Sequence, residues 1–265
     1  GSNARISGGS IKLDGKELIG LPEKEMCRIR GNDIAMIFQD PMTALNPTLT
    51  IGTQLMEPIM LHQNCGKKEA WTRAVDVLKR VGIAAPEKRM KEYPHQLSGG
   101  MRQRVMIAMA VSCEPRLLIA DEPTTALDVT IQAQILELMC ELREKMGTAI
   151  MLITHDMGVV AETADDVLVL YAGKAVEYGS IEDIFERPKH PYTQGLLNSI
   201  PRLDEDVELL NTIEGTVPAP DAMPAGCRFA PRCPYGKDRC MKEKPGVYHA
   251  GNSLVSCFRY EGEKE

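Results

Sequence analysis

No stretch of the chain approaches the roughly 18 consecutive apolar residues of a membrane-spanning helix, and its start shows no signal-peptide pattern. An excess of basic residues is also missing, because 31 lysines and arginines stand against 37 acidic residues, a formal net charge of −6. Proteins that bind the nucleic-acid backbone show the opposite balance. These absences predict a cytosolic protein without a nucleic-acid partner.

A phosphate-binding P-loop is missing as well. Its pattern is Gly-x-x-x-x-Gly-Lys-Ser/Thr, in which backbone amides wrap the phosphates. The nearest fragments, residues 66–68 and 173–175, lack both the first glycine at the right spacing and the hydroxyl residue. No match to the P-loop pattern therefore occurs within these 265 residues.

A serine and two glycines stand ahead of a helical pattern in Leu97–Arg104. Apolar residues then recur on one helix face, at Met101, Val105, Ala108 and Met109. Glycine lets the backbone approach a bound group, and a helix N-terminus offers free N–H groups and a partial positive charge. Since Ser98 adds a hydroxyl, the expected ligand is a phosphate-like anion.

Two carboxylates follow a short apolar run. Leu117–Ala120 is typical of a strand that is buried on both faces of a parallel sheet, and it leads into Asp121 and Glu122. Open α/β sheets bind ligands at the carboxyl ends of their strands. There Asp121 would suit Mg²⁺, and Glu122 could take a proton from water.

These residues resemble ABC-type ATPases. Leu97–Gln103 is similar to the signature motif, Leu117–Glu122 to the Walker B strand and Ala126–Asp128 to the D-loop. The resemblance implies an α/β, P-loop NTPase-type core with a parallel sheet, a helical signature subdomain and a Cys-rich C-terminal extension. The family's Walker A motif lies ahead of the segment that Ser10–Asp14 resembles, so an N-terminally truncated fragment is expected. A naturally degenerate subunit is the alternative.

Two further strands are predicted to end at the same sheet edge. Ile34–Phe38 is followed by Gln39, which resembles the family's Q-loop glutamine, and prolines are expected to hold the loop Asp40–Pro47 extended. Ala149–Thr154 is interpreted as another buried strand. It delivers His155, which resembles the switch histidine of the H-loop.

Four parts are expected along the chain. Residues 1–53 are a remnant of the nucleotide-binding core with the Q-loop, and 54–112 are the helical subdomain. Residues 113–186 are core with the Walker B, D-loop and H-loop segments, and 187–265 are the extension. His190–Thr193 resembles the extension of the oligopeptide and dipeptide importer branch.

Four late cysteines, Cys227, Cys233, Cys240 and Cys257, are candidate metal ligands. Their spacing lacks the tight Cys-x₂₋₄-Cys pairs of zinc ribbons, yet four thiolates suit either zinc or a [4Fe–4S] cluster. In the peptide-importer branch a similar quartet holds an iron–sulfur cluster in some members, which makes the cluster the preferred interpretation. Zinc and unligated thiols are the alternatives. The other four cysteines are interpreted as packing residues.

The resemblance also implies individual roles. Asp121 and Gln39 hold Mg²⁺, Glu122 activates the attacking water, and Gln39 and His155 sense the γ-phosphate of ATP. The residues implied to contact nucleotide are Ser98, Gly99, Gly100 and Gln103, and Asp128 is implied to bridge the interface between two ATPase domains. Without a Walker A motif, these 265 residues alone are expected to hydrolyse little ATP.

The expected function is that of the ATP-binding subunit of an oligopeptide or dipeptide importer on the cytoplasmic face of the membrane. Implied partners are a second ATPase subunit, identical or related, two transmembrane permease subunits and an extracytoplasmic peptide-binding protein. Alternatives are an importer ATPase for nickel or another small solute, and a non-catalytic module that presents the cysteine site. An ABC ATPase of DNA repair or translation is disfavoured because no sustained heptads or internal repeats occur.

Overall fold

The computed structural model describes residues 6–125, 127–200 and 212–262. The chain divides into two compact units, Gly1–Thr154 and His155–Glu265, and each is described by itself. None of the helices in the described ranges combines the length and the apolar character needed to span a bilayer. The predicted four-part division stays a prediction.

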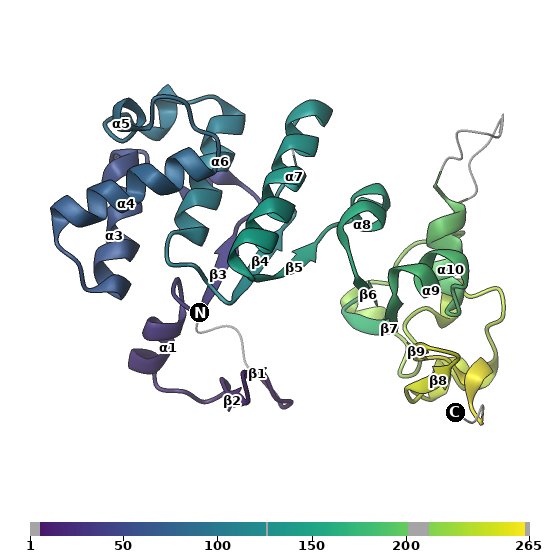
Figure 1. The fold of residues 1–265 in the computed structure, drawn as a ribbon. Helices are drawn as coiled ribbons and strands as arrows, with labels where there is room; N and C mark the ends of the chain where they lie inside the picture. The colour runs from purple at the N-terminus through teal and green to yellow at the C-terminus, as the bar shows by residue number, and fades with distance from the viewer. Residues whose placement is uncertain (1–5, 126, 201–211, 263–265) are drawn as a thin grey trace. The chain divides into compact units, whose positions relative to one another are not determined.

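The first unit contains a parallel sheet, and α7 (Val129–Met146) lies beside its strands in Figure 1. Its strands β3 (Ile34–Ile37), β4 (Leu117–Asp121) and β5 (Ala149–Ile153) pair in the order β3-β4-β5. In register, Ile37 lies opposite Ala120 and Asp121 opposite Ile153. The predicted parallel α/β sheet is thereby confirmed, and its three carboxyl ends meet at one edge.

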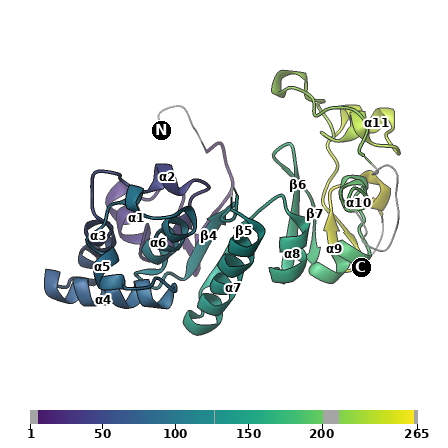
Figure 2. The same cartoon turned by 90° about the horizontal axis from the view of Figure 1, so that it is seen from above.

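Helices gather around the signature segment in the same unit. Figures 1 and 2 show α3 (Ile51–Gln63), α4 (Lys67–Arg80), α5 (Pro86–Arg89) and α6 (Gly99–Val111) packed together. A 3₁₀ turn, η1 (Pro94–Gln96), precedes α6, and α7 (Val129–Met146) follows β4. The most buried core side chains include Ile51, Leu55, Leu78, Val105, Ile107, Leu118 and Ile135. Burial of this core, rather than helix propensity, stabilises the elements that carry the site.

The loop after Gln39 is not extended, which corrects the expectation for Asp40–Pro47. A short helix, α2 (Pro41–Ala44), begins directly after Asp40. Proline at a first helical position lacks only an N–H that has no helical partner, so it tolerates this start. The Asp40 carbonyl accepts from the Thr43 and Ala44 amides at 3.3 and 3.2 Å, and this closes the turn.

The sheet strands are also less enclosed than predicted. In β4, Leu118 and Ala120 are buried, whereas Leu117 and Ile119 are only half-buried. No residue of β5 is fully buried, and Met151 and Ile153 remain 46% and 44% exposed. An apolar run indicates that a strand can be buried on both faces. Whether other elements actually cover both faces depends on the tertiary structure.

The rest of the first unit is small. Strands β1 (Lys12–Leu13) and β2 (Lys16–Glu17) form a hairpin that turns at Asp14-Gly15, and α1 (Glu23–Ile29) follows it.

An antiparallel sheet organises the second unit. Strands β6 (Asp166–Tyr171), β7 (Lys174–Ser180), β9 (Ser253–Val255) and β8 (Tyr248–Ala250) pair in the order β6-β7-β9-β8. Its helical elements are α8 (Met157–Thr163), α9 (Ile181–Glu186), α10 (Pro191–Asn198), η2 (Pro220–Ala222), η3 (Ala230–Arg232), α11 (Asp238–Lys242) and η4 (Phe258–Tyr260). Because β9 pairs with β7, the late segment shares a sheet with residues that precede position 187.

Candidate functional site

Gln39 and Glu122 meet at the carboxyl edge of the parallel sheet. Ile37 and Ala120 are paired, so the residues two positions later are brought opposite each other. The Gln39 Nε2 group donates to Glu122 Oε2 at 2.8 Å, and the Thr125 hydroxyl donates to the same oxygen at 2.9 Å. The predicted juxtaposition is confirmed, and we call Gln39, Asp121 and Glu122 the sheet-edge site.

The backbone at Glu122 turns sharply out of the strand. Its φ is +44°, in the left-handed region that few residues other than glycine adopt. Its amide donates to the Ile153 carbonyl at 2.9 Å, and its carbonyl accepts from the Thr125 amide at 3.1 Å. Neighbouring β5 and the turn after β4 thus hold the strained residue in place. Asp121, the last residue of β4, is half-buried like Glu122 and offers the hard oxygen ligands that Mg²⁺ prefers.

The start of α6 is open to solvent on one side and packed on the other. Ser98 caps the helix, its Oγ accepting from the Met101 amide at 3.4 Å. A Cβ added to Gly99 would meet nothing within 4 Å, whereas one on Gly100 would lie 3.1 Å from the Ile131 side chain on α7. Ser98 and Gly99 are therefore accessible to a ligand, and Gly100 serves the close packing of α6 on α7.

Gln103 lies inside the fold. Its side chain is 1% exposed, and its Nε2 group donates to the Pro123 carbonyl, so it fixes the segment that follows the sheet-edge site. Asp128 caps α7, accepting from the Ile131 amide at 3.0 Å, and is exposed. Ala126 of the resembled D-loop lies outside the described residues. The roles predicted for Gln103 and Asp128 toward nucleotide stay predictions.

His155 is the first residue of the second unit, two positions beyond the end of β5, and it is exposed. The adjacent Asp156 caps α8, accepting from the Gly158 amide at 2.9 Å. The role of His155 as a phosphate sensor stays a prediction.

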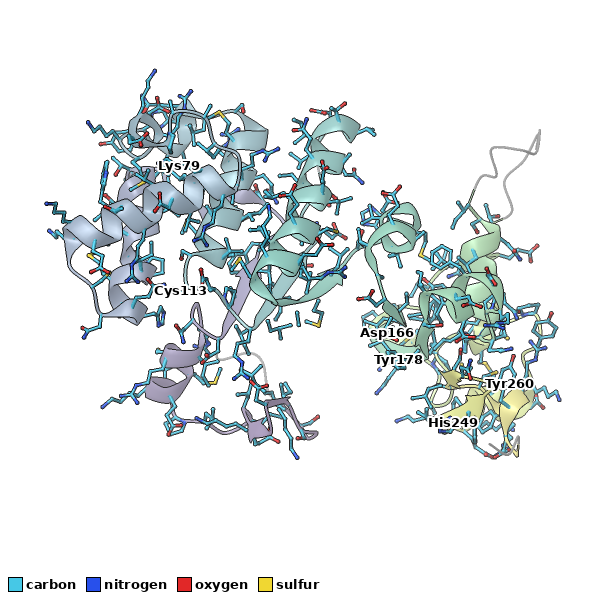
Figure 3. All side chains as sticks on the ribbon, viewed as in Figure 1. Lys79, Cys113, Asp166, Tyr178, His249 and Tyr260 are labelled. Atoms are coloured by element: carbon cyan, nitrogen blue, oxygen red, sulfur yellow. The ribbon has the colours of Figure 1, made fainter. Side chains whose placement is uncertain are left out.

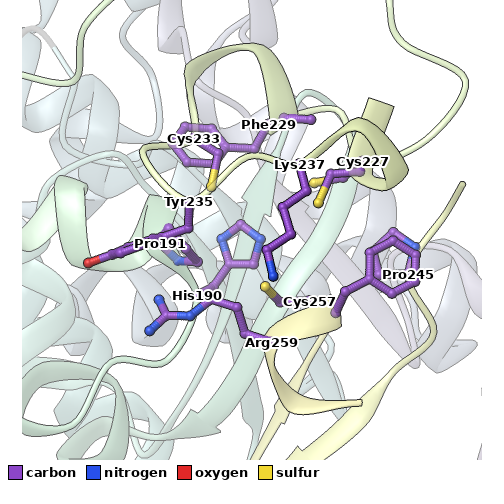
Figure 4. Close-up of a pocket in the computed structure, with 13 residues that line it drawn as sticks. His190, Pro191, Cys227, Phe229, Cys233, Tyr235, Lys237, Pro245, Cys257 and Arg259 are labelled. Atoms are coloured by element: carbon purple, nitrogen blue, oxygen red, sulfur yellow. The ribbon is translucent and has the colours of Figure 1, made fainter. Parts of the chain in front are cut away.

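The four late cysteines line one pocket in the second unit, together with His190, Lys237 and Arg259 (Figure 4). We call it the cysteine pocket. All eight cysteines are free thiols, and Cys113, labelled in Figure 3, lies in the first unit. The backbone holds part of the pocket together: the Cys227 amide donates to the Cys240 carbonyl at 2.8 Å. Gly226 is needed beside this contact, because a Cβ there would lie 2.3 Å from that carbonyl oxygen.

Three of the four thiols of the cysteine pocket have raised pKa values, which favours their protonated form. Burial raises the pKa values of Cys227, Cys233 and Cys257, and the negative charge of neighbouring thiolates raises them further. Within the described ranges, no three His, Cys, Asp or Glu side chains converge closely enough to hold a single metal ion. The thiols thus share a pocket without meeting at one point.

The prediction overlooked several residues near these sites. Thr125 binds Glu122, and Lys237 and Arg259 bring positive charge to the cysteine pocket. Buried Glu177 accepts from the Lys189 and His190 amides at 2.6 and 2.9 Å. The motif His190–Thr193 drew attention to His190, but the sequence does not show in which direction its imidazole ring points.

Two family models match the chain: "ABC transporter" over residues 2–125, and "Oligopeptide/dipeptide transporter, C-terminal region" over residues 176–240. The oligopeptide transport ATP-binding protein AppD of Bacillus subtilis is 57% identical over 99% of this chain and 80% of its own length. The oligopeptide transport ATP-binding protein OppD of Escherichia coli is 52% identical over 97% of this chain and 76% of its own length.

Solved structures show the same likeness. The dimeric post-hydrolysis state of the ATP-binding cassette MJ0796, bound to ADP and Pi, is 29% identical and superposes with a TM-score of 0.59. The match covers 66% of this chain and 74% of that one. CbiO1 from Clostridium perfringens, part of the ABC transporter complex cbiONQ, is 28% identical over 68% of this chain and 69% of its own length, with a TM-score of 0.59.

Proposed function

Because the chain belongs to the family of ABC transporter ATP-binding proteins, we propose that it energises the import of oligopeptides or dipeptides by binding and hydrolysing ATP. The observation that carries the proposal is the 57% identity to an oligopeptide transport ATP-binding protein over nearly the whole chain. The match of residues 176–240 to the C-terminal region of peptide transporters points to the same class of solute.

Glu122 is the group we propose to orient and deprotonate the attacking water. One of its oxygens already accepts hydrogen bonds from Gln39 and Thr125, which holds the carboxylate in one orientation. Asp121 and the amide oxygen of Gln39 would hold Mg²⁺, which neutralises charge on the phosphates when bound. Phosphoryl transfer depends chiefly on such positioning and charge neutralisation.

Ser98 and Gly99 are proposed to contact the nucleotide of a second ATPase subunit, identical or related. They lie at the exposed N-terminus of α6, a helix of 13 residues. Gly100 and Gln103 pack inside the fold and keep this helix in place. Asp128, capping α7 at an exposed position, would bridge the two subunits. The similar cassette MJ0796 was solved as a dimer, which favours this arrangement.

The proposal places the chain at the cytoplasmic face of the membrane, beside two permease subunits and an extracytoplasmic peptide-binding protein. Names of the similar transport ATP-binding proteins support this assembly class. Because no P-loop pattern occurs in these 265 residues, we expect them to release little phosphate from ATP by themselves. Multiple-turnover hydrolysis by this chain, abolished by Glu122→Gln, would contradict that expectation.

The decisive experiment is ATP-driven uptake into vesicles that contain the assembled transporter with its full-length ATPase subunit. Glu122→Gln should lower the uptake of a labelled peptide by about 100-fold or more, the usual contribution of a general base. Glu144→Gln, the same change at an exposed position of α7, is the matched control. Uptake of Ni²⁺ but not of peptide would show that the transported solute is not a peptide. Peptide uptake that Glu122→Gln leaves unchanged would overturn the catalytic role of Glu122.

We also propose that the cysteine pocket holds a [4Fe–4S] cluster. Tetrahedral zinc draws four sulfurs to about 2.3 Å from one ion, and the thiols here do not converge in that way. A cluster offers each thiolate its own iron atom, so it suits four thiols spread around a pocket, and Lys237 and Arg259 would offset its negative charge. Such a cluster supplies one-electron redox chemistry or a purely structural link.

A non-catalytic module that presents this pocket to a partner is the second candidate function, because the pocket is built independently of the sheet-edge site. It predicts wild-type cellular function for Glu122→Gln and loss of function for Cys233→Ser. The transport proposal predicts loss of uptake for Glu122→Gln. Comparison of Glu122→Gln with Cys233→Ser therefore distinguishes the two candidate functions.

A further inference from the structure

His190 has a role in the structure that the proposed transport function does not use. It caps α10, its Nδ1 atom accepting from the Tyr192 amide at 3.1 Å. A neutral imidazole whose Nδ1 accepts must carry its proton on Nε2. The hydrogen bond at Nδ1 therefore leaves Nε2–H as the donor of this side chain.

The position of the ring is fixed from several sides. Glu177, 1% exposed in β7, accepts from the His190 amide at 2.9 Å and from the preceding amide at 2.6 Å. The Phe229 ring packs against the imidazole at a centroid distance of 5.8 Å. His190 itself is 1% exposed. A side chain held in this way keeps one orientation, as a group that tunes a bound ligand requires.

The fixed ring faces the cysteine pocket. His190 lines this pocket together with all four late cysteines, and Figure 4 shows the imidazole in the same space as the Cys233 and Cys257 thiols. Capping alone does not account for this arrangement, because serine, aspartate or asparagine caps a helix as well without filling a pocket. The added property of histidine is an N–H donor directed away from the capped helix.

We propose that His190 is a positioning residue of the cysteine pocket, whose Nε2–H donates a hydrogen bond to a sulfur atom of the bound cluster and favours its reduced state. The inference rests on the proposed iron–sulfur site. Hydrogen bonds to the sulfurs set the potential of such clusters, because a donor stabilises the form with the larger negative charge. Lys237 and Arg259 act in the same direction from other parts of the pocket.

Two substitutions separate the donor from the cap. His190→Asn places an amide oxygen near the position of Nδ1, so it keeps the cap but does not reach the pocket. His190→Gln places its amide nitrogen near the position of Nε2, so it keeps a donor in the pocket but not the cap. A role in capping alone would disturb the stability of the glutamine variant and leave the reduction potential unchanged in both variants.

The experiment is a dye-mediated redox titration of the full chain purified without oxygen, with iron and acid-labile sulfide measured on each sample. At the wild-type midpoint potential, His190→Asn should lower the ratio of reduced to oxidised cluster at least tenfold, about 59 mV for one electron. The ratio for His190→Gln should stay within about twofold of the wild-type ratio, as expected if a donor at the same position is retained.

Each outcome has a distinct meaning. A wild-type potential in His190→Asn with full iron content overturns the role of His190 and leaves the cluster proposal intact. Loss of iron from both variants overturns it too, because the residue would then be structural, whereas loss from His190→Asn alone supports it. If the wild-type chain holds no iron or sulfide, the cluster proposal fails and the inference falls with it.

Discussion

The sheet-edge site and the cysteine pocket differ in how far each is enclosed by its own unit. At the end of the parallel sheet, Gln39 is exposed and Glu122 is half-buried. The parallel pairing of β3 with β4 places these two residues opposite each other. The cysteine pocket is assembled from short turns, and burial raises the pKa of three of its thiols. An open site is suited to a ligand that a second subunit also contacts, such as a nucleotide. An enclosed set of thiols is suited to a permanently bound ligand, such as a cluster.

The largest expected effect tests the resident ligand. Cys233→Ser should remove nearly all iron and visible absorption from the chain purified without oxygen, because a thiolate that binds one iron of the cluster is lost. Cys113→Ser is the matched control, since burial raises its pKa as well but its thiol lies 3.6 Å from the Pro58 carbonyl, outside the pocket. Equal iron content in the two variants would show that Cys233 does not bind the cluster, and would contradict a resident ligand in the cysteine pocket.

A second prediction concerns acid sensitivity of the metal-free chain. Because burial lowers the His190 pKa to about 4, the unfolded chain binds a proton between pH 6.5 and 4 that the folded chain does not. Stability should therefore fall as the pH falls through this window, by about 3 kcal/mol from this residue. Urea unfolding followed by near-ultraviolet circular dichroism would measure it, and His190→Asn should lose this part of the slope. Identical slopes would show that the ring is not held neutral by burial.

The two signature glycines provide the third test. Gly100→Ala should lower the free energy of unfolding of the first unit by about 1–3 kcal/mol, because its Cβ would press on Ile131. Gly99→Ala should not lower it, since the added Cβ meets nothing within 4 Å. Fluorescence of Trp71, the single tryptophan of the chain, reports this unfolding. Equal losses in both variants would argue against the packing role of Gly100.

The smallest effect is expected at the exposed cap of α7. Asp128→Ala should destabilise the first unit by about 1 kcal/mol, the usual loss when a capping oxygen is removed, and Asp128→Asn by much less. The same fluorescence measurement applies. If Asp128→Asn lowers stability as much as Asp128→Ala does, capping is not the main role of this side chain in the isolated chain.

Elements with a strong local pattern can be predicted from the sequence. In α4, apolar residues recur on one helix face, and Gly82, which has a φ of +75°, follows the end of the helix. Asp128 caps α7, and the hairpin of β6 and β7 turns at Ala172-Gly173. Their periodicity, caps and turn residues lie within a few positions of one another, so a single sequence contains the whole signal.

Features that depend on distant partners were missed. Whether β5 is covered on both faces, and whether Gln103 turns inward to the Pro123 carbonyl, depends on elements far along the chain. The strands β8 and β9 were not predicted either, because their three-residue segments form only by pairing, β9 with β7. Such short segments have no period long enough to detect.

By itself the sequence determined which residues could do chemistry at the sheet edge, because strand ends and the residues that follow them are local, and parallel register then aligns Gln39 with Glu122. Only the tertiary structure decided that Gly99 is open while Gly100 is packed, and that the ring of His190 enters the cysteine pocket. The physical reason is that packing and side-chain direction depend on atoms brought together from distant parts of the chain, and no local pattern encodes their positions.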